Sequence, residues 1–203
     1  MLGEFVARYF HVLFGIVWIG MLYHFNFVQT EYFKEAEASA KSDAMAKLAP
    51  RALWWFRWGA MFTFLTGAYL LHSVGALGGV QAAIWMGALA GTFMFLNVWL
   101  IIWPNQQIVL GMKEGEGPVA AAKAGLASRT NTLFSGPMLL GMLGAKHLPI
   151  AGSINGVYAA MGLIVLLEIN AIVGKQGPMQ SVKGVIVSSL VLTVVIFALL
   201  QHL

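Results

Sequence analysis

Long apolar runs separated by polar stretches dominate the chain from one end to the other. Six of these runs approach the length of about twenty residues that a helix needs to cross a bilayer. They cover residues 5–29, 54–76, 82–103, 130–147, 153–174 and 181–201. The fourth is the weakest, because it is short and is interrupted by Pro137 and several glycines. The pattern predicts an all-α integral membrane protein, a single domain built as a bundle of about six transmembrane helices.

The basic residues are divided unevenly between the two sides that six crossings would create. Ten of the twelve Lys and Arg residues fall in the first, third and fifth connecting segments, with Arg129 assigned to the third. Only Arg8 and Lys146 fall on the other side. Because Lys and Arg gather in cytoplasmic loops, the asymmetry predicts that both termini lie outside, in an N-out/C-out arrangement.

The first connecting segment is predicted to be helical. Glu37 and Lys41, and likewise Asp43 and Lys47, are opposite charges four residues apart, a spacing that supports a helix. We expect this helix to continue the first transmembrane helix into the cytoplasm and to end at Pro50.

Composition agrees with the hydropathy pattern and excludes several kinds of site. The chain of 203 residues is 59% hydrophobic and 10% charged, whereas about a quarter of the residues in soluble domains are charged. The net charge of +4 resides mainly in loops, so it indicates membrane orientation and no nucleic-acid partner. With no cysteine, a metal or haem would need histidine or oxygen ligands. The start of the chain lacks signal-peptide features, so we expect the first run to be retained.

A stripe of small residues marks the third run. Ala83, Gly87 and Gly91 are spaced four residues apart and lie on one face of a helix. Such small-xxx-small stripes let a second transmembrane helix approach closely, and the sequence leaves the identity of that helix open.

Histidines gather toward the predicted outer side. At 1.5 Å per residue, His11 lies about 9 Å and His72 about 6 Å below the outer boundary, and His147 and His202 end the fourth and sixth runs. A b-type haem needs one or two imidazoles at matched depth. His11, as ligand of the haem iron, with His72 or His147, forms the candidate set. The alternative is that the two terminal histidines are ordinary interfacial residues.

A second polar set lies toward the inner side. Glu168 is the only acid inside a predicted run, and His24 and Asn97 share its depth. A buried carboxyl group needs a partner or a proton. A pair of His24 with Glu168, beside Asn97, could therefore bind a quinone head group or relay protons. A structural hydrogen-bonded clamp between helices is the equally weighted alternative.

Three stretches of the chain resemble the membrane domain of the bacterial membrane-bound urate oxidase (urate hydroxylase) family. Residues 11–20 read H-V-L-F-G-I-V-W-I-G, similar to the family's H-V-x-x-G-I-x-W-I-G. Residues 55–58 and 63–67 read W-F-R-W and T-F-L-T-G, similar to W-F-K-W and T-W-L-S-G. The most specific stretch comprises residues 91–98 and 101–106, G-T-F-M-F-L-N-V and I-I-W-P-N-Q, similar to G-T-I-M-x-x-N-V and I-I-P-N-Q.

The resemblance implies a related membrane scaffold in a bacterial inner membrane, with His11 and His147 in places comparable to those of family histidines. Other family histidines are replaced, by Trp54, Trp85 and Thr130. The family's long insertion between the tryptophan-bearing regions and its C-terminal cytochrome c domain have no counterpart here. The resemblance therefore does not imply urate oxidation.

These observations favour a membrane subunit of a respiratory-type electron-transfer system that binds one b-type haem near the outer face. Its expected partners are the lipid bilayer, other membrane subunits and a periplasmic cytochrome c supplied as a separate polypeptide. The alternative is a cofactor-free accessory subunit of a larger respiratory or photosynthetic membrane complex. A transporter is less favoured, because the sequence has no inverted repeat and no matched pair of broken helices.

Overall fold

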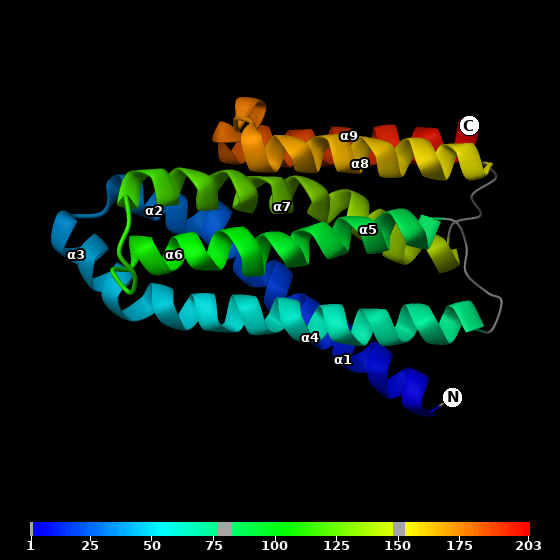
Figure 1. The fold of residues 1–203 in the computed structure, drawn as a ribbon, viewed down its shortest axis with the longest axis horizontal. Helices are drawn as coiled ribbons and strands as arrows, with labels where there is room; N and C mark the ends of the chain where they lie inside the picture. The colour runs from blue at the N-terminus through cyan, green and yellow to red at the C-terminus, as the bar shows by residue number, and fades with distance from the viewer. Residues whose placement is uncertain (1, 77–82, 148–152) are drawn as a thin grey trace.

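The computed structural model describes residues 2–76, 83–147 and 153–203. Within these residues the chain is all-helical and has no strand. Six long helical stretches lie side by side, as the hydropathy pattern predicts (Figure 1).

Several of the long stretches are interrupted by short π-helical segments. The first stretch consists of α1 (Leu2–Tyr23), η1 (His24–Gln29) and α2 (Thr30–Glu35). The second consists of α3 (Ala38–Asp43), η2 (Ala44–Leu48) and α4 (Ala49–Ala76). The third consists of α5 (Ala83–Leu96), η3 (Asn97–Ile102) and α6 (Trp103–Val109). The remaining elements are α7 (Gly117–His147), α8 (Ile154–Val173), the 3-10 turn η4 (Gly177–Gln180) and α9 (Val182–His202).

Four helical stretches of the described chain are long and apolar enough to cross a membrane. They are Leu2–Glu35, Ala83–Val109, Ile154–Val173 and Val182–His202. With 28 and 31 residues, α4 and α7 are also long enough to span a bilayer, but they are more polar. The polarity of α7 has a structural cause, because most of its polar residues face the inside of the bundle.

The helix α7 occupies the centre of the bundle. It packs against α5 and α6 on one side and against α8 and α9 on another, and it meets α1 near Tyr23 (Figure 1). In contrast, α1 packs mainly on α4. It diverges from the other helices toward its N-terminal end. The beginning of α1 and the end of α9 lie at the same end of the bundle (Figure 1).

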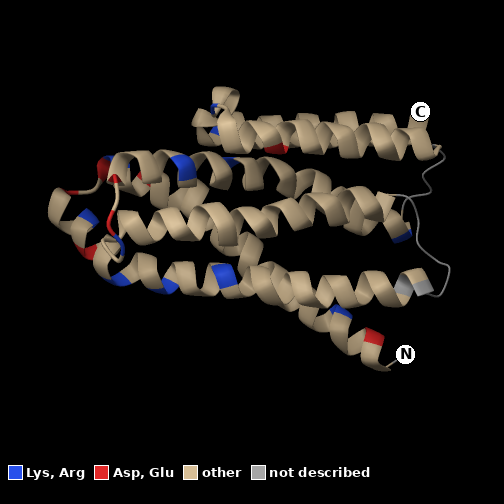
Figure 2. Cartoon of the chain, viewed as in Figure 1, with Lys and Arg blue, Asp and Glu red and all other residues tan. Residues whose placement is uncertain are grey.

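Lys and Arg residues gather at the opposite end of the bundle, around α2, α3, the α6–α7 connection and η4 (Figure 2). The uneven distribution along the sequence is therefore also present in the folded chain. Arg8, near the start of α1, and Lys146, in the last turn of α7, belong to the other end. We call the end where Lys and Arg gather the basic end below.

The small-residue stripe of α5 packs against α7. A Cβ atom added to Gly141 of α7 would lie 2.6 Å from the Cα atom of Gly87 and 2.9 Å from the backbone oxygen of Ala83. Farther along the stripe, a Cβ on Gly91 would lie 3.6 Å from the sulfur of Met138. The two helix backbones therefore touch where both residues lack a side chain, which is the close approach that such stripes allow.

The predicted runs correspond to the six long helices, and the main differences concern their ends. The first and fourth helices extend to Leu2–Glu35 and Gly117–His147, beyond the predicted 5–29 and 130–147. The predicted start of the third run, residue 82, lies outside the described residues.

Two interpretations of the connecting segments are wrong. Pro50 does not end a helix: it is the second residue of α4, which continues directly from η2. The first helix instead ends at Glu35, because Ala36 adopts an extended conformation. Arg129 is not a loop residue, since it lies well inside α7 and is only 5% exposed.

We expect Gly141→Ala to lower the free energy of unfolding by about 1–3 kcal/mol, because the added methyl group forces α5 and α7 apart. The matched control is Gly162→Ala in α8, where an added Cβ meets no atom within 4 Å. This control should leave stability unchanged or raise it by up to about 1 kcal/mol. Thermal unfolding of the detergent-purified variants measures both effects, and equal stability of the two variants would contradict the observed α5–α7 contact.

Candidate functional site

A continuous set of polar side chains lies buried along α7. Arg129, Thr130, Asn131, Thr132 and Ser135 are each at most 5% exposed, although the helices around them are apolar. Polar groups in such surroundings need internal hydrogen-bond partners, because neither water nor lipid supplies them. For Thr130, Asn131, Thr132 and Ser135 the partners come from α7 itself and from the first and third helical stretches.

One group of contacts joins α7 to η3 and α8. The side-chain amide nitrogen of Asn97 donates to Oδ1 of Asn131 at 2.9 Å and to Oε2 of Glu168 at 3.1 Å. The amide of Asn131 in turn donates to the backbone oxygen of Met94 at 2.9 Å. All three polar side chains are buried, with exposures of 0–7%. This Asn97–Asn131–Glu168 cluster is the polar core of the bundle.

The polar core includes two of the three residues assigned from the sequence to a quinone or proton site. Asn97 and Glu168 meet, whereas no contact in the described part of the chain joins His24 to Glu168. The imidazole of His24 is half-buried and lies edge-on to Phe25, with ring centroids 5.6 Å apart. Glu168 is thus partnered by an amide, and the expected His24–Glu168 pair is replaced by the Asn97–Glu168 hydrogen bond.

A second group of contacts joins α7 to the first helical stretch. The amide nitrogen of Asn26 donates to Oγ of Ser128 at 2.8 Å and to the backbone oxygen of Leu22 at 2.9 Å. Two turns farther along α7, the hydroxyl groups of Tyr23 and Ser135 are 2.8 Å apart. Sequence reasoning missed Tyr23, Ser128 and Ser135 because it searched mainly for ionisable groups. The available signal was the dense Ser, Thr and Asn content at the start of an otherwise apolar run.

His11 lies apart from these clusters, between α1 and α4. Its Nδ1 is 2.9 Å from the backbone oxygen of Thr63 and 3.2 Å from Oγ1 of Thr66. Because a carbonyl oxygen can only accept, Nδ1 carries the proton in this contact and Nε2 is left for another partner. The ring packs over Gly67, where an added Cβ would lie 2.9 Å from Cε1. The half-buried imidazole is therefore held in one orientation by the backbone of α4.

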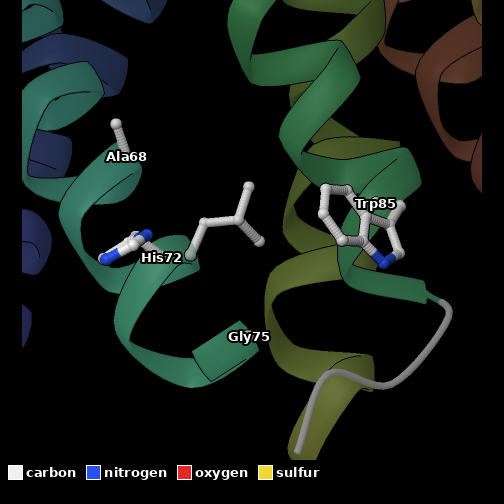
Figure 3. A pocket seen from close by; sticks show the side chains of 5 residues that line it. Ala68, His72, Gly75 and Trp85 are labelled. Carbon is white, nitrogen blue, oxygen red and sulfur yellow. The ribbon is translucent and has the colours of Figure 1, made fainter. Parts of the chain in front are cut away.

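The structure does not bring the other two haem-ligand candidates into contact with His11. His72 is exposed and lines a cavity of about 510 Å³ between α4 and α5, which Trp85 borders from the α5 side (Figure 3). His147 is exposed at the end of α7. Among the described residues, no three His, Cys, Asp or Glu side chains are grouped to hold a metal ion.

Comparison with known proteins decides the family. A family model described as urate oxidase N-terminal matches residues 73–201, which is more than half of the chain. The chain belongs to the urate oxidase N-terminal family. No curated protein and no solved structure matches it.

The match covers some candidate site residues of this urate oxidase N-terminal chain and leaves others outside. It contains the stretch at residues 91–106 that carries the most specific resemblance, and with it the whole polar core. His147 also lies within the match, whereas His11 and His72 lie before it. The polar core is therefore part of the region that places the chain in its family, and the α1–α4 pair around His11 lies outside that region.

Proposed function

We propose that the chain is an integral membrane subunit of an electron-transfer system and that it binds one b-type haem through His11. The observation that carries the proposal is the hydrogen bond from Nδ1 of His11 to the backbone oxygen of Thr63. Histidines that ligate metals commonly donate their second ring nitrogen to a carbonyl oxygen or carboxylate, which fixes the tautomer and orients the ring. His11 has this arrangement, in a half-buried position on an apolar helix.

The residues around His11 fit a single imidazole ligand. The carbonyl oxygen of Thr63 holds the proton on Nδ1, and Gly67 leaves room for the ring. A b-type haem, when bound, supplies one-electron transfer, and its potential depends on its axial ligands. His72, near the end of α4, and His147, at the end of α7, remain candidates for the second axial position. These helix ends lie at the same end of the bundle as the beginning of α1, whose first half carries His11.

The polar core offers a site of a second kind. The amide of Asn97 donates to Asn131 and to Glu168, and Glu168 presents the carboxyl group that a quinone head group or a proton relay needs. We therefore also propose that Asn97 and Glu168, with His24 nearer the basic end, bind a quinone head group or relay protons. Their hydrogen bond also supports the simpler role of a clamp between η3 and α8.

The orientation in the proposal follows from charge. With the basic end on the cytoplasmic side of a bacterial inner membrane, both termini and His11 lie toward the periplasm. A periplasmic cytochrome c and further membrane subunits are then the partners that can exchange electrons with a haem at this depth.

The alternative function is a cofactor-free accessory subunit of a larger membrane complex. A specific observation favours it: the ring of His11 fills the space over Gly67 and bonds to α4, which is what a packing residue between two helices does. Haem content distinguishes the two functions.

A pyridine haemochrome spectrum of the detergent-purified chain should give about one b-type haem per chain. We expect His11→Ala to lose at least nine-tenths of it at unchanged expression, since the iron loses its ligand. His202→Ala, at the exposed end of α9, is the matched control and should retain the haem. Absence of haem from the unmodified chain would favour the accessory subunit, and full retention of haem by His11→Ala would contradict His11 as the haem ligand.

Single cysteines test the orientation, because the chain contains none of its own. Asn155→Cys, in the first turn of α8, should react with a membrane-impermeant maleimide in intact spheroplasts. Glu114→Cys, in the exposed α6–α7 connection, should react only after the membrane is permeabilised. The reverse labelling pattern would place the basic end outside and contradict the proposed orientation.

A further inference from the structure

A polar cavity of about 260 Å³ opens at the basic end of the bundle, among η1, α4, α7 and η4. Four glutamine side chains, from separate parts of the chain, line it: Gln29, Gln106, Gln176 and Gln180. Among the described residues that line it, Arg129 of α7 is the only one with a charged side chain. The volume is near the lower limit for small-molecule sites and suits a ligand of about ten non-hydrogen atoms.

Two polar atoms of the cavity lining have no hydrogen-bond partner within the described chain. One is Nη1 of Arg129, in a side chain that is only 5% exposed, and the other is Oε1 of Gln29. The next polar residues of α7 are satisfied, since Thr130 donates to Leu126 O and Asn131 donates to Met94 O. Arg129 therefore differs from its neighbours, although it is equally buried.

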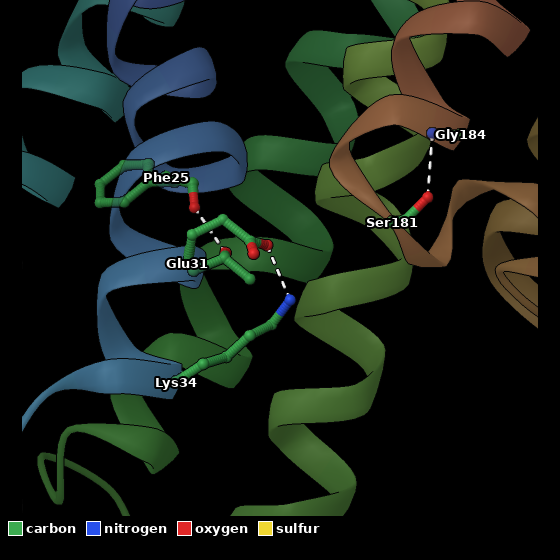
Figure 4. A network of polar contacts seen from close by, with 6 residues as sticks. Phe25, Glu31, Lys34, Ser181 and Gly184 are labelled. Carbon is green, nitrogen blue, oxygen red and sulfur yellow. Dashed lines mark hydrogen bonds and ion pairs between the residues drawn. The ribbon is translucent and has the colours of Figure 1, made fainter.

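No acid of the described residues forms an ion pair with Arg129. The ion pairs among the described residues are Arg8–Glu4, Lys34–Glu31 and Lys47–Asp43. Figure 4 shows that Glu31 and Lys34 of α2, close to this end of the bundle, face each other, with Nζ and Oε1 2.7 Å apart. Glu31 acts on the charge of Arg129 but is not within ion-pair distance of it. A buried guanidinium without a carboxylate at ion-pair distance is unfavourable, so an anion that reached Nη1 would stabilise it.

The lining limits which anion can fit. One positive charge matches a single negative charge, and a planar guanidinium suits a carboxylate. The unpaired oxygen of Gln29 accepts, so it requires an N–H or O–H donor on the ligand. Phe25 and Phe56 form an apolar part of the wall, with ring centroids 5.5 Å apart, against which an apolar body can pack.

We propose that this cavity binds a small organic monocarboxylate that also carries an N–H or O–H donor, with the carboxylate on Arg129 and the donor on Gln29. This site is independent of the haem proposed at His11, because the two share no residue.

The first test uses the unmodified, detergent-purified chain and calorimetric titration with matched probes. 4-Aminobenzoate has the required carboxylate, ring and amino donor, and we expect a dissociation constant below about 1 mM for a ligand of this size. 4-Aminobenzamide, its uncharged counterpart, should bind at least tenfold more weakly. Benzoate, which lacks the amino donor, should bind more weakly than 4-aminobenzoate. Equal binding of the acid and the amide would overturn the proposal, as would no binding of 4-aminobenzoate at about 10 mM.

The second test changes the site. Arg129→Gln should weaken 4-aminobenzoate binding at least tenfold, whereas Arg51→Gln, an exposed change in the first turn of α4, should leave it unchanged. Gln29→Leu should abolish the advantage of 4-aminobenzoate over benzoate and leave benzoate binding unchanged. Unaltered binding by Arg129→Gln would overturn the assignment.

Two further measurements distinguish a carboxylate site from a purely structural arginine and from a phosphate site. The ligand-free Arg129→Gln variant should melt no lower than the unmodified chain, since it loses a buried charge that has no paired counter-ion. A markedly lower melting temperature would indicate that Arg129 is a structural residue and would count against the site. Displacement of 4-aminobenzoate by equimolar inorganic phosphate would assign the cavity to phosphate groups, free or lipid-borne, and would also overturn the proposal.

Discussion

The satisfaction of the buried polar side chains of α7 is the constraint on which the rest of the bundle depends. A helix with buried Ser, Thr and Asn residues at the level of its apolar neighbours is stable there only if the protein itself supplies the hydrogen bonds. Asn97 of η3 and Asn26 of η1 supply them from two different directions. With α8 joined through Glu168, the helices around α7 are fixed by specific contacts in addition to apolar packing.

Two backbone features follow the same constraint. The π-helical segments η1 and η3 contain Asn26 and Asn97, the two residues whose amides reach α7. Such segments change the direction of side chains within a helix and are frequent where a helix carries a functional group. The contact between Gly87 and Gly141 brings α5 and α7 close enough for the amides to meet. The close approach of the α5 and α7 backbones and the hydrogen bond between the amides of Asn97 and Asn131 therefore stabilise the same pair of helical stretches.

The three candidate sites lie in different parts of the bundle. The core around Asn97 is buried inside the bundle, the cavity at Arg129 lies at the basic end, and His11 lies on the α1–α4 pair. A chain that places these groups on different helix pairs can combine a haem ligand with a small-molecule site, because neither requires the other to move.

The sequence predicted the elements well and the contacts between them poorly. The six apolar runs, the uneven basic residues and the stripe at Gly87 are local or periodic features, and each has a counterpart in the structure. The partner of Glu168 was mistaken, because two residues at equal depth meet only if their helices are adjacent and suitably rotated, which depth does not reveal. Arg129 was placed in a loop for a related reason, because its charge favoured a position exposed to solvent. In the structure it is buried by helices that are distant in the sequence.

The contacts of residues with uncharged polar side chains were the hardest to predict from the sequence. Asn131 has contacts on both sides, yet no candidate site predicted from the sequence included it. Asn and Thr residues are common in helices that lie within a bundle, and a single sequence does not indicate which neighbour each amide reaches.

A double-mutant cycle on Asn97 and Asn131 tests most directly whether the polar face of α7 holds the bundle together. Unfolding of Asn97→Leu, Asn131→Leu and the double variant would be measured in detergent. Because each single change leaves a buried partner unsatisfied, we predict single losses of about 1–3 kcal/mol and a double loss smaller than their sum by at least about 0.5 kcal/mol. Additive losses, or single changes without effect, would contradict this role of the polar face.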